Sequence, residues 1–173
     1  MKHWYMLTVV GKDRPGIVAH LSAALFDGGC NLGEATMMRL GGNFTIMLMV
    51  EFDGNSSALT HMVEPVAESM GLHLHVDRID AKLHQHPEPD VRITVYGADR
   101  AGIVAHITGA LAEAGLHILD MDTSVAGTEE KPIYIMQIEG HAAEGVDALQ
   151  SALDAVAEKG VEAQLESIDT MIG

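Results

Sequence analysis

One eight-residue segment occurs twice and carries residue types suited to holding a small anion. It reads Asp13-Arg14-Pro15-Gly16-Ile17-Val18-Ala19-His20 in the first half and Asp99-Arg100-Ala101-Gly102-Ile103-Val104-Ala105-His106 in the second. In each copy it stands between a strand-like segment and a helical apolar pattern. A helix N-terminus presents unpaired amide groups and the positive end of a dipole, which favour a carboxylate or a phosphate. We therefore expect a binding site for a small charged metabolite here.

Each notable residue of this turn has a binding and a structural interpretation. Gly16 and Gly102 would let backbone amides approach a ligand, or would only permit a tight turn. Arg14 and Arg100 would contact a carboxylate, or would be solvated loop cations. Asp13 would serve equally as a helix cap, because Asp is a preferred N-cap residue. Recurrence in both copies favours binding, although duplicated copies also share folding constraints.

The elements that position these turns come from an internal repeat. Residues 7–32 align without gaps to residues 93–118, and thirteen of the 26 pairs are identical. The prolines of the segment 81–89 remove amide donors and fix φ, which predicts an extended linker. We therefore predict a first domain over 1–80, a linker over 81–89 and a second domain over 90–173.

Within the first copy the patterns predict the element order βαββαβ. Strands are expected over 4–10, 30–39, 44–52 and 73–79, and helices from Ile17 to Gly28 and from Leu59 to Met70. Pro65 should kink the second helix, because it cannot donate to the carbonyl of His61. Two right-handed crossovers and a hairpin place both helices on one face of a four-stranded antiparallel sheet. The fold class is α+β, two ferredoxin-like modules in tandem.

The other face of each sheet is expected to stay open, which invites a partner copy. The methionines at 37–38 and 47–49 would either fill the core, the favoured interpretation, or form an adaptable partner surface. Homo-oligomers are therefore expected.

Composition excludes several classes of partner. Ten Lys and Arg against 25 Asp and Glu give a net charge of −15, which disfavours direct binding to nucleic acid and to anionic membranes. No stretch approaches the roughly 18 apolar residues of a membrane span, and no secretory signal is apparent, so a cytoplasmic location is expected. Cys30 is the only cysteine, and the ten histidines lack companion ligands. We therefore expect no metal and no cofactor.

The motif Asp-Arg-Pro-Gly-Ile-Val, followed by Gly-Cys-Asn-Leu at the second strand, resembles the ACT domain. The resemblance covers nearly the whole chain, and two such modules without a catalytic domain are similar to the glycine cleavage system transcriptional repressor family. It implies a regulatory protein that binds an amino acid. It also implies that the first β–α turn and the start of the second strand meet between modules to form the site.

The residues carried over by this resemblance form a first and a second predicted site. The first site comprises Asp13, Arg14, Pro15, Gly16, Ile17, Asn31 and Leu32. The second site comprises Asp99, Arg100, Ala101, Gly102, Ile103, His117 and Ile118. The second departs from the pattern, because His117 replaces Asn31 and Ala101 replaces Pro15. It is either degenerate or tuned to another ligand.

Three functions from different classes follow. The leading hypothesis is a regulator that binds a small amino acid of the glycine or serine class and restrains a DNA-binding transcription activator without touching DNA. The alternative is a free-standing regulatory subunit of an amino-acid or folate enzyme. A small enzyme is disfavoured, because no nucleophile–base pair or paired carboxylates are apparent and no catalytic residue is assigned.

Overall fold

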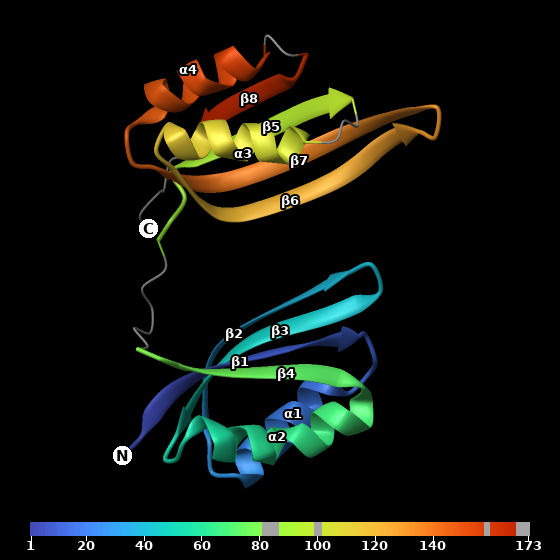
Figure 1. Ribbon diagram of the computed structural model, residues 1–173, viewed down its shortest axis with the longest axis vertical. Coiled ribbons are helices and arrows are strands. Elements are labelled where there is room, and N and C mark those ends of the chain that lie inside the picture. The colour runs from blue at the N-terminus through green and yellow to red at the C-terminus, as the bar shows by residue number, and fades with distance from the viewer. Residues whose placement is uncertain (81–86, 99–101, 158–159, 169–173) are drawn as a thin grey trace. The chain divides into compact units, whose positions relative to one another are not determined.

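The computed structural model describes residues 1–80, 87–98, 102–157 and 160–168. The chain divides into two compact units, Met1–Gln85 and His86–Gly173. Figure 1 gives the course of the chain through each unit. Residues 81–86 of the expected linker lie outside the described residues, so the linker and the domain boundaries remain predictions.

The first unit has the predicted βαββαβ order. Its elements are β1 (His3–Lys12), α1 (Ile17–Asp27), β2 (Asn31–Leu40), β3 (Asn43–Phe52), α2 (Ser56–Met70) and β4 (Leu72–Ile79). The strands form one antiparallel sheet in the order β2-β3-β1-β4. Helix α2 is one continuous helix through Pro65, with its N-terminus capped by the side chain of Asn55.

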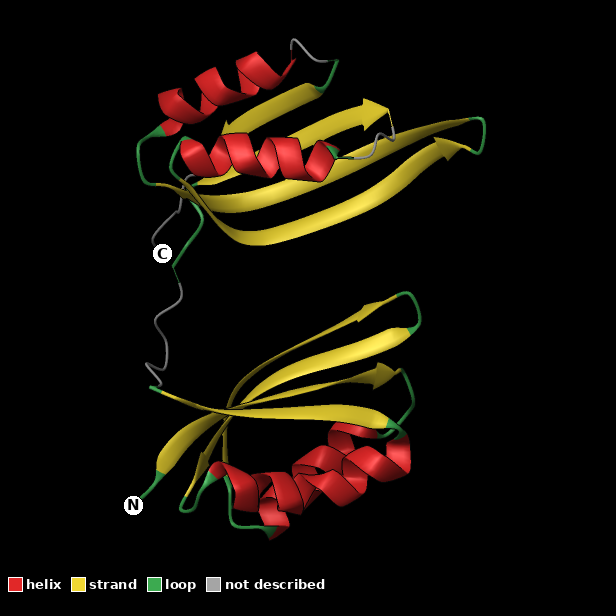
Figure 2. Cartoon of the chain, viewed as in Figure 1, coloured by secondary structure: helices red, strands yellow, loops and turns green. Residues whose placement is uncertain are grey.

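The second unit repeats the order and the sheet topology. Its elements are β5 (Val91–Ala98), α3 (Ile103–Glu113), β6 (Leu116–Thr128), β7 (Lys131–Ala142), α4 (Val146–Ala157) and β8 (Glu162–Ser167), with the sheet order β6-β7-β5-β8. In each unit both helices cover one face of their own sheet (Figure 2). The second hairpin is longer than the first, because β6 and β7 pair up to Thr128 and Lys131, whereas β2 and β3 pair up to Leu40 and Asn43.

Alternation along the strands and helical spacing build each core. In β1 the buried side chains are Tyr5, Leu7 and Val9, and the helix face that covers them buries Ile17, Leu21 and Leu25. Period two in the strand and steps of four in the helix put these residues on facing surfaces. A separate cluster forms the core of the second unit. The two-module fold predicted from the sequence is confirmed.

Three methionines of strands β2 and β3 lie on the surface of the first unit rather than in its core. Met37, Met38 and Met47 are 46%, 56% and 48% exposed. Strand β2 lies at the edge of the sheet. Met38 in β2 and Met47 in β3 occupy the face of the sheet opposite the buried side chains of β3. The expectation that these three methionines fill the core of their own module is wrong, because their side chains are exposed rather than buried.

Candidate functional site

The turn between β1 and α1 is built around a glycine in the left-handed region. Gly16 is the N-cap of α1 and has φ 91°, and Gly102 at the start of α3 has the same φ. An added Cβ on Gly16 would lie 3.1 Å from Nδ1 of His20. Glycine is therefore required by the turn itself, as the structural interpretation of Gly16 proposed.

The first amides of α1 lack partners from the described part of the chain. No side chain caps the helix, and the first bond of the turn is donated by the His20 amide to the Gly16 carbonyl at 3.0 Å. The amides of Ile17, Val18 and Ala19 precede that bond, so no described carbonyl or side chain accepts from them. They are left for water or for a ligand.

A hollow of about 220 Å³ lies at this helix start, and we call it the turn hollow. Its lining residues are Asp13, Arg14, Pro15, Gly16, Ile17, Val18, Ala19, Met37, Arg39 and Phe44. The five turn residues of the predicted first site therefore line one cavity together with the residues that carry the unpaired amides. This cavity is what a small anion at the helix start would need.

Asp13 does not cap the helix, so that interpretation is wrong. Its carboxylate instead forms an ion pair with Arg39, whose Nε lies 3.0 Å from Oδ2 of Asp13, and its amide donates to the carbonyl of Gly42. Both contacts tie the turn to the β2–β3 hairpin, which lies at this end of the sheet because Lys12 pairs with Asn43. An exposed ion pair of this kind contributes at most about 1 kcal/mol, so its effect is mainly to orient the turn.

His20, which the repeat retains as His106, closes the turn. Its Nδ1 lies 2.7 Å from the Gly16 carbonyl oxygen, and because that oxygen can only accept, Nδ1 carries the proton. Asp13 and His20 both recur in the repeat, but Asp13 contacts the β2–β3 hairpin whereas His20 contacts the carbonyl of Gly16. Arg14 is exposed and has no carboxylate partner among the described residues.

Asn31 and Leu32 lie at the opposite end of the same sheet. Asn31 pairs with Glu51 of β3, whereas Lys12 next to the turn pairs with Asn43. Eight residue steps along β3 separate these rows, which is about 26 Å. The structure therefore does not bring Asn31 and Leu32 to the turn of their own module, and neither borders the turn hollow.

The side chain of Asn31 already has a partner. Its Nδ2 donates to Oε2 of Glu51 at 2.8 Å, and Nζ of Lys2 donates to the same oxygen at 3.1 Å. These hydrogen bonds, that of Asn31 first, hold the pKa of Glu51 below its ordinary value. The amide oxygen of Asn31 is what remains available to a ligand ammonium group.

The predicted second site is only partly described. Asp99, Arg100 and Ala101 lie outside the described residues. Gly102 and Ile103 begin α3 as Gly16 and Ile17 begin α1, without a side-chain cap. At the far end His117 pairs with His141, so the Asn31–Glu51 pair is absent here, and Ile118 pairs with Gly140.

Sequence reasoning missed the hairpin residues of the turn hollow, Met37, Arg39 and Phe44. The signal was present in the predicted topology. In an antiparallel β1–β3 pair the start of β3 lies beside the end of β1, so the β2–β3 hairpin has to border the β1–α1 turn.

Other candidate groups fall outside this site. Cys30 is buried, its thiol lies 3.7 Å from Sδ of Met62, and burial raises the pKa of that thiol. Among the described residues no three His, Cys, Asp or Glu side chains are placed to hold a metal ion. Within the same residues no helix has both the length and the apolar character to cross a membrane.

Comparisons with known proteins agree with this architecture. The chain is 24% identical over 150 residues, 85% of this chain and 79% of the relative, to the glycine cleavage system transcriptional repressor of Escherichia coli. A solved structure of an unknown protein from Galdieria sulphuraria superposes with a TM-score of 0.76 at 24% identity, covering 97% of this chain and 99% of that one. A solved candidate glycine cleavage system transcriptional repressor gives 0.71 at 19% identity, over 97% and 98% of the chains.

The sequence model of the ACT domain family matches residues 3–77 and 90–165. These two ranges include all eight described strands except the last residues of β4 and β8, and all four described helices. The chain therefore belongs to the ACT domain family and carries two copies of that domain.

Proposed function

We propose that this chain is a regulatory protein that responds to a small amino acid bound at the turn from Asp13 to Ile17. One observation carries the proposal: a helix start with unpaired amides borders a cavity lined by the turn itself. The membership in the ACT domain family and the similarity to a transcriptional repressor support a regulatory role rather than a catalytic one.

The cavity suits a small ligand with a carboxylate. Its 220 Å³ is the volume of about seven waters at roughly 30 Å³ each, enough for glycine or serine. The amides of residues 17–19 would donate to the carboxylate, and Arg14 would add a charge-assisted contact. Glycine and serine are favoured because the similar E. coli protein is named for the glycine cleavage system.

A ligand that touched both parts of the predicted site would need two modules. The turn and Asn31 lie about 26 Å apart along one sheet, so the turn of one module and the Asn31 of another would have to supply them.

The output would be indirect control of transcription. A net charge of −15 opposes binding to DNA, which is itself densely negative. The effector would instead shift the population of a form that binds a DNA-binding activator. Regulation of an amino-acid or folate enzyme is the alternative, and a co-purification that captured such an enzyme in place of a DNA-binding protein would favour it.

A thermal-shift panel of the amino acids tests the effector site. A ligand that binds only the folded state raises stability by about 2.7 kcal/mol at a hundredfold excess over its Kd. We expect one or two small amino acids to raise the unfolding temperature. Arg14→Gln should reduce the shift, whereas Arg78→Gln, which makes the same charge change beside His3 at a distant strand end, should leave it intact.

The two modules can be compared in the same assay. Asn31→Ala should weaken the response more than His117→Ala, because the second module lacks the Asn31–Glu51 pair. Equal losses from the two variants, or no response to any amino acid, would count against the site.

A further inference from the structure

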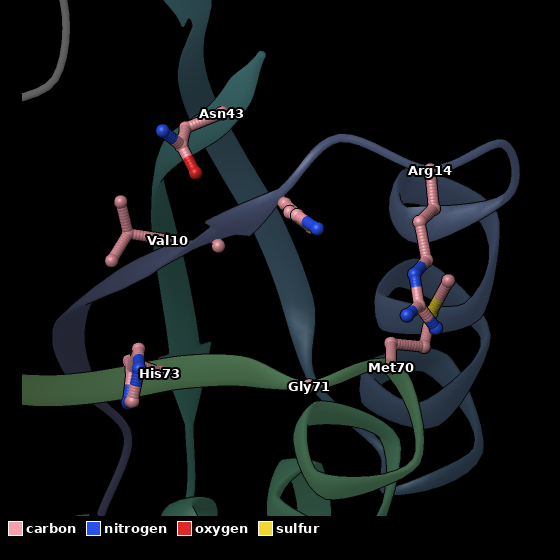
Figure 3. Close-up of a pocket in the computed structure, with 8 residues that line it drawn as sticks. Val10, Arg14, Asn43, Met70, Gly71 and His73 are labelled. Atoms are coloured by element: carbon pink, nitrogen blue, oxygen red, sulfur yellow. The ribbon is translucent and has the colours of Figure 1, made fainter. Parts of the chain in front are cut away.

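A second and larger hollow lies on the other side of Arg14, and we call it the cationic hollow. It has a volume of about 500 Å³ and is lined by Val10, Gly11, Lys12, Arg14, Asn43, Met70, Gly71 and His73. Figure 3 shows Arg14 reaching from the β1–α1 loop on one side, with Asn43 and His73 on the other. Three segments distant in sequence, the end of β1, the start of β3 and the start of β4, meet there.

The charge of this lining is opposite to that of the chain. Lys12 and Arg14 are both present, and none of the eight lining residues is acidic. Acidic residues outnumber basic ones 25 to 10 in the whole sequence. The lining of this hollow is therefore basic, in contrast to the acidic composition of the whole chain.

These cations are also unpaired within the described residues. Lys2, Arg39 and Arg92 each form an ion pair with a carboxylate. Lys12 and Arg14 form none with any described group. Two cations that line one hollow without a counterion repel each other, which a bound anion would relieve.

The nearby end of α2 does not account for both charges. Met70 and Gly71 place the C-terminus of that helix at the hollow, and α2 has no basic residue in its last turn. A helix C-terminus is equivalent to about −0.5 charge. Two full positive charges exceed this, so the hollow keeps a net positive character of about one and a half charges.

The second module lacks Lys12, Asn43 and His73, although Arg100 stands at the position of Arg14. The three replaced residues are therefore not a requirement of the fold. Lys12 pairs with Asn43 in the first sheet, and at the equivalent position of the second sheet Ala98 pairs with Ile133. His73 pairs with Val10 in the first sheet, and at the equivalent position of the second sheet Glu162 pairs with Tyr96. The same fold therefore forms with neutral and acidic residues at these positions.

We propose that the cationic hollow binds a small, doubly charged oxyanion, a ligand that carries a phosphate group or two carboxylates. Lys12 supplies a point charge, Arg14 a planar fork that matches such oxyanions, and His73 and Asn43 supply further donors. This site shares Arg14 with the turn hollow but is otherwise lined by different residues. Its ligand class differs from the zwitterionic amino acid proposed there.

The test is a titration of the full-length chain followed by ¹⁵N–¹H NMR at constant ionic strength. Separate arms use inorganic phosphate, succinate and glycine. We expect phosphate or succinate to shift the amide of His73, which lines only the cationic hollow, saturably, and glycine to leave it unchanged. No saturable shift with either dianion, or an equal response to glycine, would overturn the proposal.

Matched variants separate specific binding from the general effect of charge. Lys12→Gln should raise the Kd for the dianion on the order of tenfold, the loss of one hydrogen bond to a charged group. Lys2→Gln removes the same charge at the other end of β1 and should leave the Kd unchanged. Equal weakening by both variants would mean that only net charge is sensed and would overturn the site.

Discussion

The backbone of Gly16, at φ 91°, lies in a region that side-chain-bearing residues rarely adopt, and His20 fills the space that a Cβ would need. We predict that Gly16→Ala lowers the free energy of unfolding by about 1–2 kcal/mol, the usual cost of a left-handed conformation in a non-glycine residue. Urea unfolding of the two proteins measures this difference.

Gly109 provides the matched control for that prediction. It lies inside α3 at an ordinary φ, and a Cβ there would meet nothing within 4 Å. Gly109→Ala should therefore raise stability, by up to about 1 kcal/mol. If Gly16→Ala proved neutral, the turn would not have the geometry described.

Asn31 can be tested through the carboxylate that it contacts. Hydrogen bonds from Asn31 and Lys2 lower the pKa of Glu51, so the folded state binds that proton less readily than the unfolded chain. The resulting stability is present above the ordinary pKa of Glu, about 4.3, and is lost as the pH falls through the lowered folded value.

Asn31→Ala should consequently raise the pKa of Glu51 toward its ordinary value. A carboxyl NMR titration of Glu51 measures the change. Asn43→Ala is the control, because Asn43 lies eight residues away along β3 and makes no bond to Glu51. An unchanged pKa in Asn31→Ala would show that the amide does not bond to Glu51 in solution.

At the scale of elements, helix α1 holds the turn in place through one face. Leu25 is fully buried, whereas its neighbour Phe26 is 78% exposed. Leu25→Ala should cost about 2–5 kcal/mol through lost burial and a cavity, and Phe26→Ala should change stability by less than about 0.5 kcal/mol. Thermal and urea unfolding compare them, and similar losses would mean that α1 presents a different face to the sheet.

The elements themselves were largely predictable from sequence. The period of two through Tyr5, Leu7 and Val9 and the spacing of four between Leu21 and Leu25 assign the layers, and the internal repeat gives each assignment twice. Local patterns do not show which positions the other elements cover, which is why Met37, Met38 and Met47 are expected in the core although they are exposed.

The site was predictable only in part, for reasons that are equally physical. A helix start with Gly16 can be identified from local sequence. The partner of Asp13 cannot be identified from local sequence, because strand pairing brings Arg39 to Asp13. An Asp before a helix usually caps that helix, which is why a cap was the expected role. The partnership of Asn31 with Glu51 depends on register, which a residue pattern alone does not fix.

At the scale of the whole molecule, net charge decides which macromolecule the chain can approach. Fifteen excess negative charges should prevent association with duplex DNA at any ordinary salt concentration. Fluorescence anisotropy with a labelled duplex should show no binding at low salt, where nonspecific attraction is strongest. Saturable binding of the purified chain would contradict an indirect route to transcription.

The central claim is that the bare amides at the start of α1 hold the carboxylate of a small amino acid. The most direct measurement is a ¹⁵N–¹H NMR titration of the full-length chain with glycine and with serine. The account predicts saturable shifts at the amides of Ile17, Val18 and Ala19, reduced by Arg14→Gln. Amides at these three positions that stay unmoved while another region of the chain responds would contradict it.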